Sequence, residues 1–130
     1  MHSTTYQYLN IRSAAILTTS YVAGTVIGPT NGNPSQNNQL VVYLSFTKGS
    51  LTTLEMKVEF SHDGTTYYQE TYSAVSAGTS TDTLGEHAVS ATGNYRISIP
   101  IKDNYIKISV KGTGTVTSSS ATVTAILGTV

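Results

Sequence analysis

Residues 54–60 alternate between apolar and charged side chains without a break. The apolar members are Leu54, Met56, Val58 and Phe60, and the charged members are Glu55, Lys57 and Glu59. A period of two residues predicts a β-strand with one face in a hydrophobic core and the other in water. The strand runs into Asp63 and Gly64, a pair that favours a tight turn with a positive φ, and Tyr67 and Tyr68 follow at once. We therefore expect the chain to fold back as a hairpin at the centre of an all-β domain.

Several other stretches share this period or this residue usage. The expected strands, besides residues 53–61, are 14–22, 39–47, 66–75, 83–89, 95–101, 105–111 and 120–127. Turn-forming residues separate them at the spacing of about 8–12 residues that is typical of a sandwich or barrel, and no segment shows a sustained helical period. The predicted fold class is all-β, an antiparallel sandwich of about eight strands that is jelly-roll-like or Ig-like, with an N-terminal arm.

Strands 95–101 and 105–111 flank a turn at residues 102–104, so we expect them to pair as a second hairpin. Pro100 lies near the end of the first of these strands. Because proline cannot donate a hydrogen bond to a neighbouring strand, it indicates a sheet edge or a bulge. Residues 112–115 are expected to open a further loop before the last strand closes the fold.

Composition narrows the class of protein. The chain has 130 residues, enough for one domain with a real core, and only 11% of them are charged, against a usual share of about 25%. Seven basic and seven acidic residues balance to a formal net charge of zero, which argues against nucleic-acid binding. There is no cysteine, which excludes disulfides, and no apolar run long enough to span a bilayer. Without a signal-peptide pattern, we expect a chain made and kept in a cytoplasm, with no nucleic-acid or membrane partner.

Two segments stand outside the predicted strands. Residues 1–13 are polar with scattered apolar residues, and they are expected to form an N-terminal arm, loosely ordered or docked on a neighbour, with a plain edge strand as the alternative. Residues 14–130 are expected to form a single β-sandwich domain. Within it, residues 28–38 are a dense cluster of turn formers without charge, which predicts a long surface loop of the kind often used for function or for an interface.

No group of residues in the sequence predicts catalysis. The Ser-His-Asp run at 61–63 lies in the expected turn, and consecutive residues rarely aim at one point as a nucleophile, base and orienting acid must. Asp82, Glu86 and His87 have no spacing typical of a metal loop. The acids of strand 53–61 lie on one solvent face rather than across a cleft, and no glycine-rich phosphate loop is present. We expect no enzymatic activity, no catalytic or metal-binding residues and no cofactor.

Tyrosine is the remaining candidate for function, with nine copies and no tryptophan in the chain. Exposed tyrosine can stack on sugars or anchor a protein interface, and it also serves as a half-buried strand residue with its hydroxyl in water. All three interpretations stay open. The candidate interface or ligand residues are Tyr6, Tyr8, Asn31, Asn33, Tyr67, Tyr68 and Tyr72.

Three runs of the sequence carry a family resemblance. They are AAILTTSYVAGTVIG, QLVVYLSFTKGSLTTLEMKVEFSHDGTTYYQE and TGNYRISIPIKDNYIKISVKGTGT. The shared elements are a strand that ends in a Ser-polar-Asp-Gly turn followed by aromatic residues, and a late Tyr-Ile-Lys-Ile-Ser-Val strand that ends in Gly-Thr-Gly. In these elements residues 14–127 resemble small β-sandwich virion structural proteins of tailed bacteriophages.

The resemblance implies a non-enzymatic part of a phage particle and brings no catalytic residues. The leading expectation is a capsid decoration (cement) protein that binds and stabilises neighbouring capsid subunits, as a homo-oligomer for which a trimer would suit the local three-fold points of a capsid. Its partners would be the major capsid protein or other virion proteins, and its place would be the virion, after assembly in the host bacterial cytoplasm. The alternative is a neck, tail or fibre component with a carbohydrate- or receptor-binding module that uses Tyr67, Tyr68 and residues 28–38.

Overall fold

The computed structural model describes residues 6–129, without the side chains of residues 6, 72–74 and 83. The strands are β1 (Tyr6–Ala15), β2 (Val22–Ala23), β3 (Gln39–Thr47), β4 (Leu51–Ser61), β5 (Tyr68–Gln69), β6 (Thr71–Ser76), β7 (Thr79–Leu84), β8 (His87–Val89), β9 (Gly93–Pro100), β10 (Tyr105–Gly114) and β11 (Ser120–Gly128). One turn of 3-10 helix, η1 (Pro34–Gln36), interrupts the second connection. The predicted class, an all-β antiparallel sandwich, is confirmed.

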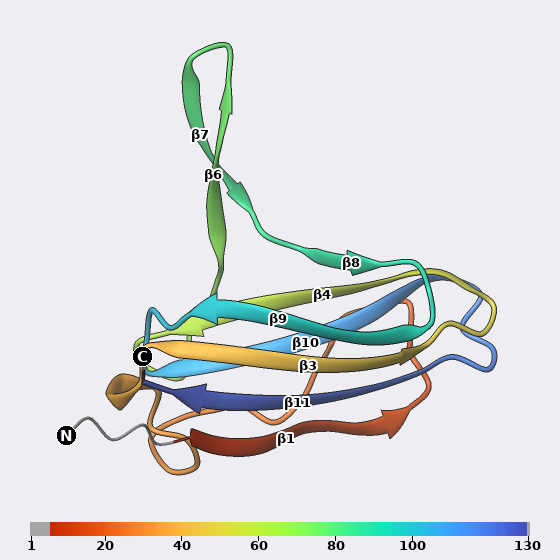
Figure 1. Ribbon diagram of the computed structural model, residues 1–130, viewed down its shortest axis with the longest axis horizontal. Helices are drawn as coiled ribbons and strands as arrows, with labels where there is room; N and C mark the ends of the chain where they lie inside the picture. The colour runs from red at the N-terminus through yellow and green to blue at the C-terminus, as the bar shows by residue number, and fades with distance from the viewer. Residues whose placement is uncertain (1–5, 130) are drawn as a thin grey trace.

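The strands form two main sheets that pack face to face (Figure 1). Sheet A has the order β1-β11-β3-β9, and sheet B has the order β2-β10-β4-β5, with β8 also paired to β4. A third, two-stranded sheet consists of β6 and β7 alone, and it projects away from the sandwich (Figure 1). The strand pairs of all three sheets are antiparallel.

The strands of the sandwich pair in a nested order. The sandwich has eight strands if β5 and β8 are counted as one. The first strand then pairs with the last, β1 with β11. Inside this pair, β2 pairs with β10, β3 pairs with β9, and β4 pairs with β5 and β8. This is the order of one long antiparallel hairpin that has been rolled up. Two further pairings, β11 with β3 and β10 with β4, then join the rolled strands into sheets A and B. Of the two predicted architectures, the topology is therefore that of a jelly roll.

The core lies between the two sheets and is built from their alternating strands. The apolar residues of β4 predicted to face inward, from Leu54 to Phe60, are all buried, and so is the corresponding row of β3 from Leu40 to Phe46. The core side chains are each at most 3% exposed. Burial of a large apolar side chain contributes about 1.5–3 kcal/mol. The two-residue period is therefore what holds the sheets together.

The N-terminal segment differs from its prediction. From Tyr6 onward it forms β1, the edge strand of sheet A, so the edge-strand alternative describes residues 6–13, and residues 1–5 lie outside the described part of the chain. The strand expected at 14–22 is wrong, because β1 ends at Ala15 and the chain then crosses to sheet B. Leu17 anchors this crossing. Its side chain is buried, and its backbone N–H donates to the Ser119 hydroxyl at 3.2 Å.

The hairpin predicted between residues 95–101 and 105–111 is also wrong. Both strands exist, but β9 pairs with β3 in sheet A and β10 pairs with β4 in sheet B. Each strand faces the core from its own sheet, so residues 101–104 connect the two layers. The edge position predicted from Pro100 is confirmed, since β9 is the last strand of sheet A. The loop predicted at 112–115 begins later, because β10 continues to Gly114.

Candidate interaction site

The Ser-His-Asp run forms a turn, as predicted. The Ser61 hydroxyl accepts the Gly64 N–H at 2.9 Å, and Asp63 Oδ1 accepts the backbone N–H groups of Thr65 and Thr66 at 2.9 and 3.0 Å. Gly64 has a φ of +78°. The N–H of Thr66, then that of Thr65, and then the Ser61 hydroxyl lower the pKa of Asp63 to about 2. The serine and the aspartate are therefore used to fix the backbone between β4 and β5.

The loop at 28–38 is held by its own asparagines. Asn31 accepts the Gly28 N–H through Oδ1 at 2.7 Å and donates through Nδ2 to the Val26 carbonyl at 2.9 Å. Asn33 takes a left-handed conformation, with a φ of +46°, at the start of η1. Its carbonyl oxygen accepts the Nδ2 group of Asn37 at 3.0 Å. The side-chain amide of Asn31 thus holds the start of the loop in place.

The loop and the turn lie side by side at one end of the sandwich. A Cβ atom on either Gly28 or Gly64 would lie within about 3.0 Å of the Tyr105 ring, so this ring separates the two segments. Tyr67 lies in the same region. Lys107 covers its ring, with Nζ 4.1 Å from the ring centroid. The pKa of Tyr67 is raised, first by partial burial and then by the proximity of Tyr105.

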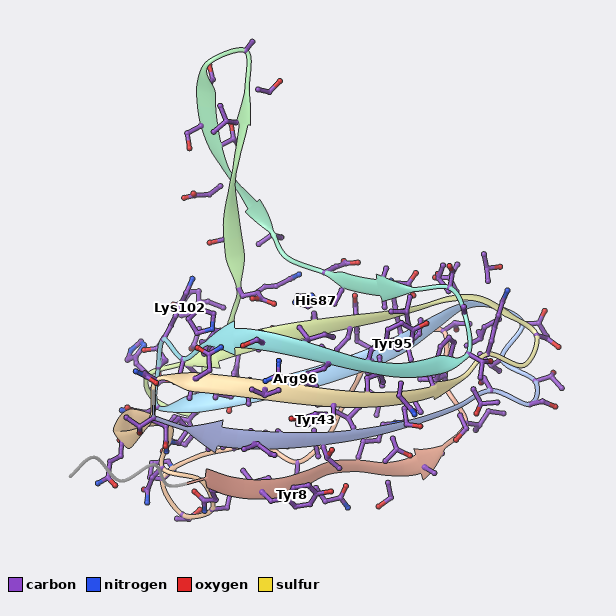
Figure 2. The ribbon with its side chains drawn as sticks, viewed as in Figure 1. Tyr8, Tyr43, His87, Tyr95, Arg96 and Lys102 are labelled. Atoms are coloured by element: carbon purple, nitrogen blue, oxygen red, sulfur yellow. The ribbon has the colours of Figure 1, made fainter. Side chains whose placement is uncertain are left out.

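The remaining candidate tyrosines do not form one cluster. Tyr8 is 66% exposed on β1, and Tyr68 is 60% exposed on β5. These strands are edges of different sheets on opposite sides of the sandwich (Figures 1 and 2). The side chains of Tyr6 and Tyr72 lie outside the described part of the structure. The seven candidate residues therefore do not define a single site.

The most unusual feature of the molecule is an insertion in the edge strand of sheet B. β5 pairs with the end of β4, where Tyr68 lies opposite Phe60, and the Glu70 N–H donates to the Val58 carbonyl at 2.9 Å. The same edge of β4 is then followed by β8, where His87 lies opposite Met56. One edge strand is thus split, and residues 71–85 leave it and return. The single strands predicted at 66–75 and 83–89 are wrong for this reason.

The inserted segment is a two-stranded hairpin. Thr71 lies opposite Leu84 at its base, and Ser76 lies opposite Thr79 at its tip. The tip is the Ala77-Gly78 pair, with φ values of +51° and +79°. Two central residues with positive φ match the right-handed twist of a hairpin. Threonine, which is β-branched and favours extended backbone, occurs once in β6 and three times in β7.

Three side-chain and backbone contacts fix the base of the hairpin to the sandwich. The Gly85 N–H donates to the Glu70 carbonyl at 2.8 Å, and Gln69 Nε2 donates to the Gly85 carbonyl at 2.7 Å. His87 Nε2 lies 2.6 Å from Glu70 Oε1, which joins the residue before the insertion to one just after it. These contacts hold the point from which the hairpin projects.

The hairpin itself is exposed. Val75 is 73% exposed and Leu84 is 62% exposed, and the core of the protein includes no described residue of 71–85. An isolated two-stranded hairpin is marginally stable in water, and within the described residues β6 and β7 form a sheet only with each other. Projecting strands of this kind are available to pair with another chain. We define residues 71–85 as the projecting hairpin and take it as the candidate interaction site.

The described carboxylates of sheet B take part in local contacts. In the part of the chain that the structure describes, three or more His, Cys, Asp or Glu side chains nowhere gather closely enough to hold a metal ion. On the outer face of sheet B, Glu55 Oε1 accepts hydrogen bonds from the hydroxyls of Thr53 and Thr113. On the same face, Glu59 Oε1 lies 3.6 Å from Lys57 Nζ. No helix within residues 6–129 has the length and apolar character to cross a membrane.

Comparisons with known proteins extend only to the fold. No family model matches the sequence, and no curated protein matches it. A chain from "Bacillus endospore appendages form a novel family of disulfide-linked pili" is similar in structure, with a TM-score of 0.53 and 12% sequence identity over 98% of this chain and 89% of that one. A chain of infectious bursal disease virus, Gx strain, is similar with a TM-score of 0.53 and 9% identity. The match covers 98% of this chain and 33% of the viral chain. At sequence identities this low, the two likenesses show a shared β-rich fold.

Proposed function

We propose that the protein is a non-enzymatic structural subunit of a bacteriophage virion, and within that class a capsid decoration protein that binds neighbouring capsid subunits. One observation carries the proposal. The projecting hairpin interrupts the edge strand of an otherwise complete jelly roll, and it exposes apolar side chains without serving the core. The fold shared with chains of a pilus and of a virus is consistent with a subunit of a large assembly.

Binding would proceed by strand addition. An unpaired edge of the hairpin would add to a strand of the capsid, with main-chain hydrogen bonds supplying affinity. Val75 and Leu84 would leave water at the same time, and burial of apolar surface contributes about 25 cal/mol per Å². Because bound protein stabilises the state to which it binds, occupancy of these sites would raise the cost of separating capsid subunits.

Charge favours close contact. The chain has no net charge, and Asp82 is the single Asp, Glu, Lys, Arg or His in the sequence of the projecting hairpin. A surface with little charge pays little desolvation when it is packed against another protein. The base contacts at Glu70 and His87 would hold the hairpin ready for docking, which reduces the entropy lost on binding.

The proposal also includes the partners of the hairpin. We infer that the hairpin engages the major capsid protein or another virion protein, and that a homo-oligomer, such as a trimer around a local three-fold axis, would present several hairpins at once. Several weak contacts would then act together. The protein would be made in the host bacterial cytoplasm and function in the virion, without contact to nucleic acid or membrane.

The test is an excision of residues 71–85. Joining Glu70 to Glu86 lets the two halves of the edge strand continue along β4, because Glu70 already bonds opposite Val58 and His87 lies opposite Met56. We expect the excised protein to fold and to lose binding to capsids prepared without this chain. A loss of at least about tenfold in affinity, measured by co-sedimentation, corresponds to about 1.4 kcal/mol.

Two double-substitution variants distinguish binding through the hairpin from non-specific binding through other exposed apolar side chains. The Val75→Ser/Leu84→Ser variant removes the exposed apolar side chains of the hairpin, and Val22→Ser/Val26→Ser removes two exposed apolar side chains from sheet B and the following loop. We expect weaker capsid binding only from the first. The proposal fails if the full chain is absent from particles, or if the excised protein binds capsids as well as the full chain.

A further inference from the structure

The outer face of sheet A carries a shallow groove that the virion proposal does not use. Its volume is about 360 Å³, and β3, β9 and β11 line it. The strand register places six side chains of these strands in two rows of three on the outer face, each opposite its neighbour. The rows are Arg96, Tyr43 and Thr124, and Asn94, Ser45 and Thr122.

Arg96 and Tyr43 line this groove and lie on neighbouring strands (Figure 2). The Arg96 guanidinium carbon lies 6.0 Å from the centroid of the Tyr43 ring, and Arg96 Nε donates to the Tyr43 hydroxyl at 3.4 Å. Tyr43 remains 38% exposed. The ring therefore has a cation beside it and still offers surface to a ligand.

The charge of the groove has one sign. Asp and Glu are absent from the strands of sheet A, β1, β3, β9 and β11. Of the two arginines in these strands, Arg12 donates to the backbone carbonyls of Ala15, Ile16 and Ala121. Arg96 forms no ion pair with any described carboxylate. A guanidinium in this state is suited to bind a carboxylate in a bidentate way.

We propose that this groove binds a saccharide that carries a carboxylate, of the uronic acid type. The carboxylate would pair with Arg96, and the apolar face of the sugar ring would lie on Tyr43. The hydroxyls of Thr122, Thr124 and Ser45 and the amide of Asn94 both donate and accept hydrogen bonds, as sugar hydroxyls do. The volume suits one or two sugar rings.

A saccharide fits these observations better than a protein segment. The groove is lined by hydroxyl, amide and guanidinium groups together with two tyrosine rings, so it offers no row of pockets for alternate side chains of a peptide. The inference is also independent of the projecting hairpin, which belongs to sheet B's edge. The excised protein that lacks residues 71–85 should therefore keep this binding.

The test measures binding of trigalacturonate, and of a neutral galactose trisaccharide, to the full chain by isothermal titration calorimetry. The key variants are Arg96→Gln and Tyr43→Ala. Lys102→Gln, on an exposed lysine just beyond β9, controls for general charge, and Tyr8→Ala, on another exposed tyrosine of sheet A, controls for loss of an aromatic ring (Figure 2). Nuclear magnetic resonance shifts then report whether the contacted amides belong to β3, β9 and β11.

We expect trigalacturonate to bind at least tenfold more tightly than the neutral sugar. Arg96→Gln and Tyr43→Ala should each weaken it at least tenfold, while Lys102→Gln and Tyr8→Ala change it less than twofold. The proposal would be overturned if Lys102→Gln lost as much affinity as Arg96→Gln, or if the neutral sugar bound as tightly as trigalacturonate. Absence of trigalacturonate binding at millimolar concentration would also overturn it. So would an acidic tripeptide that binds as tightly as trigalacturonate, since the groove would then recognise a carboxylate alone.

Discussion

The sandwich and the projecting hairpin are built from the same kind of backbone, yet they are stabilised in different ways. Each strand of the sandwich places alternate side chains in a shared core. The hairpin, residues 71–85, has a ladder of its own and a two-residue turn, but its described apolar residues Val75 and Leu84 face water. Strand formation therefore needs only local preferences and a turn, whereas strand stability requires a second layer.

This difference determines what each region can do. A segment whose loss leaves the core intact can open, pair and exchange without unfolding the rest of the protein. The sandwich provides the rigid base, through the contacts of Glu70 with Gly85 and His87, and the hairpin provides exposed edges. We expect mutations to have large effects on stability in the sandwich and small ones in the hairpin.

The largest effect on stability is expected from Phe46→Ala. Phe46 is one of the largest fully buried side chains, and its removal would leave a cavity between the sheets. Deletions of this kind cost about 3–5 kcal/mol. Urea unfolding of the full chain measures the loss, and Val75→Ala in the hairpin, where the side chain is exposed, should change the free energy of unfolding by less than about 0.5 kcal/mol.

A matched pair of glycines gives a finer contrast. Gly64 and Gly78 have nearly the same φ, +78° and +79°, but a Cβ on Gly64 would lie 3.0 Å from the Tyr105 ring and one on Gly78 would meet nothing within 4 Å. Alanine at either position is strained by about 1–2 kcal/mol. Gly64→Ala adds a packing clash, so we expect about 2–3 kcal/mol of lost stability.

Gly78→Ala should instead open the hairpin locally. Because such opening does not require the core to unfold, thermal unfolding of this variant should stay close to that of the unchanged protein. Equal losses from the two glycines would show that the hairpin unfolds together with the sandwich, which would break the comparison.

The smallest effect concerns pH and the Asp63 turn. The pKa of Asp63 is lowered to about 2 from an ordinary 3.8, so its ionised form stabilises the folded state above the ordinary value. This contribution is lost as pH falls through about 2. The stability difference between the unchanged protein and Asp63→Asn, measured by urea unfolding, should shrink between neutral pH and about pH 2. A difference that stays constant with pH would contradict this role of the carboxylate.

The sequence was most informative where side chains meet a core. The rows of β3 and β4 predicted both strands almost to the residue, and the Asp63-Gly64 turn followed from its residue types. Which strands lie beside each other in a sheet was harder to predict. Periodicity shows that a strand has an inner face but not which strand lies beside it, so β9 and β10 were paired with each other although they belong to different sheets.

The candidate site was the least predictable part. The hairpin has no apolar row, because it has no inner face, and its Thr-, Ser- and Ala-rich sequence resembles that of a loop. Its turn, Ala77-Gly78, has an alanine where asparagine or aspartate is the usual signal. The groove at Tyr43 and Arg96 was missed for another reason, since its side chains come from strands distant in sequence and meet only in the sheet register.

The most direct test of the account is hydrogen exchange of the backbone amides, measured for the free protein and for the protein bound to capsids. We predict that amides of residues 71–85 exchange quickly in the free protein, while those of β4 and β10 stay protected, and that capsid binding then protects the hairpin. Hairpin amides that are as protected as β4 in the free protein, or that remain unprotected on the capsid, would contradict the claim that this segment is an independent docking element.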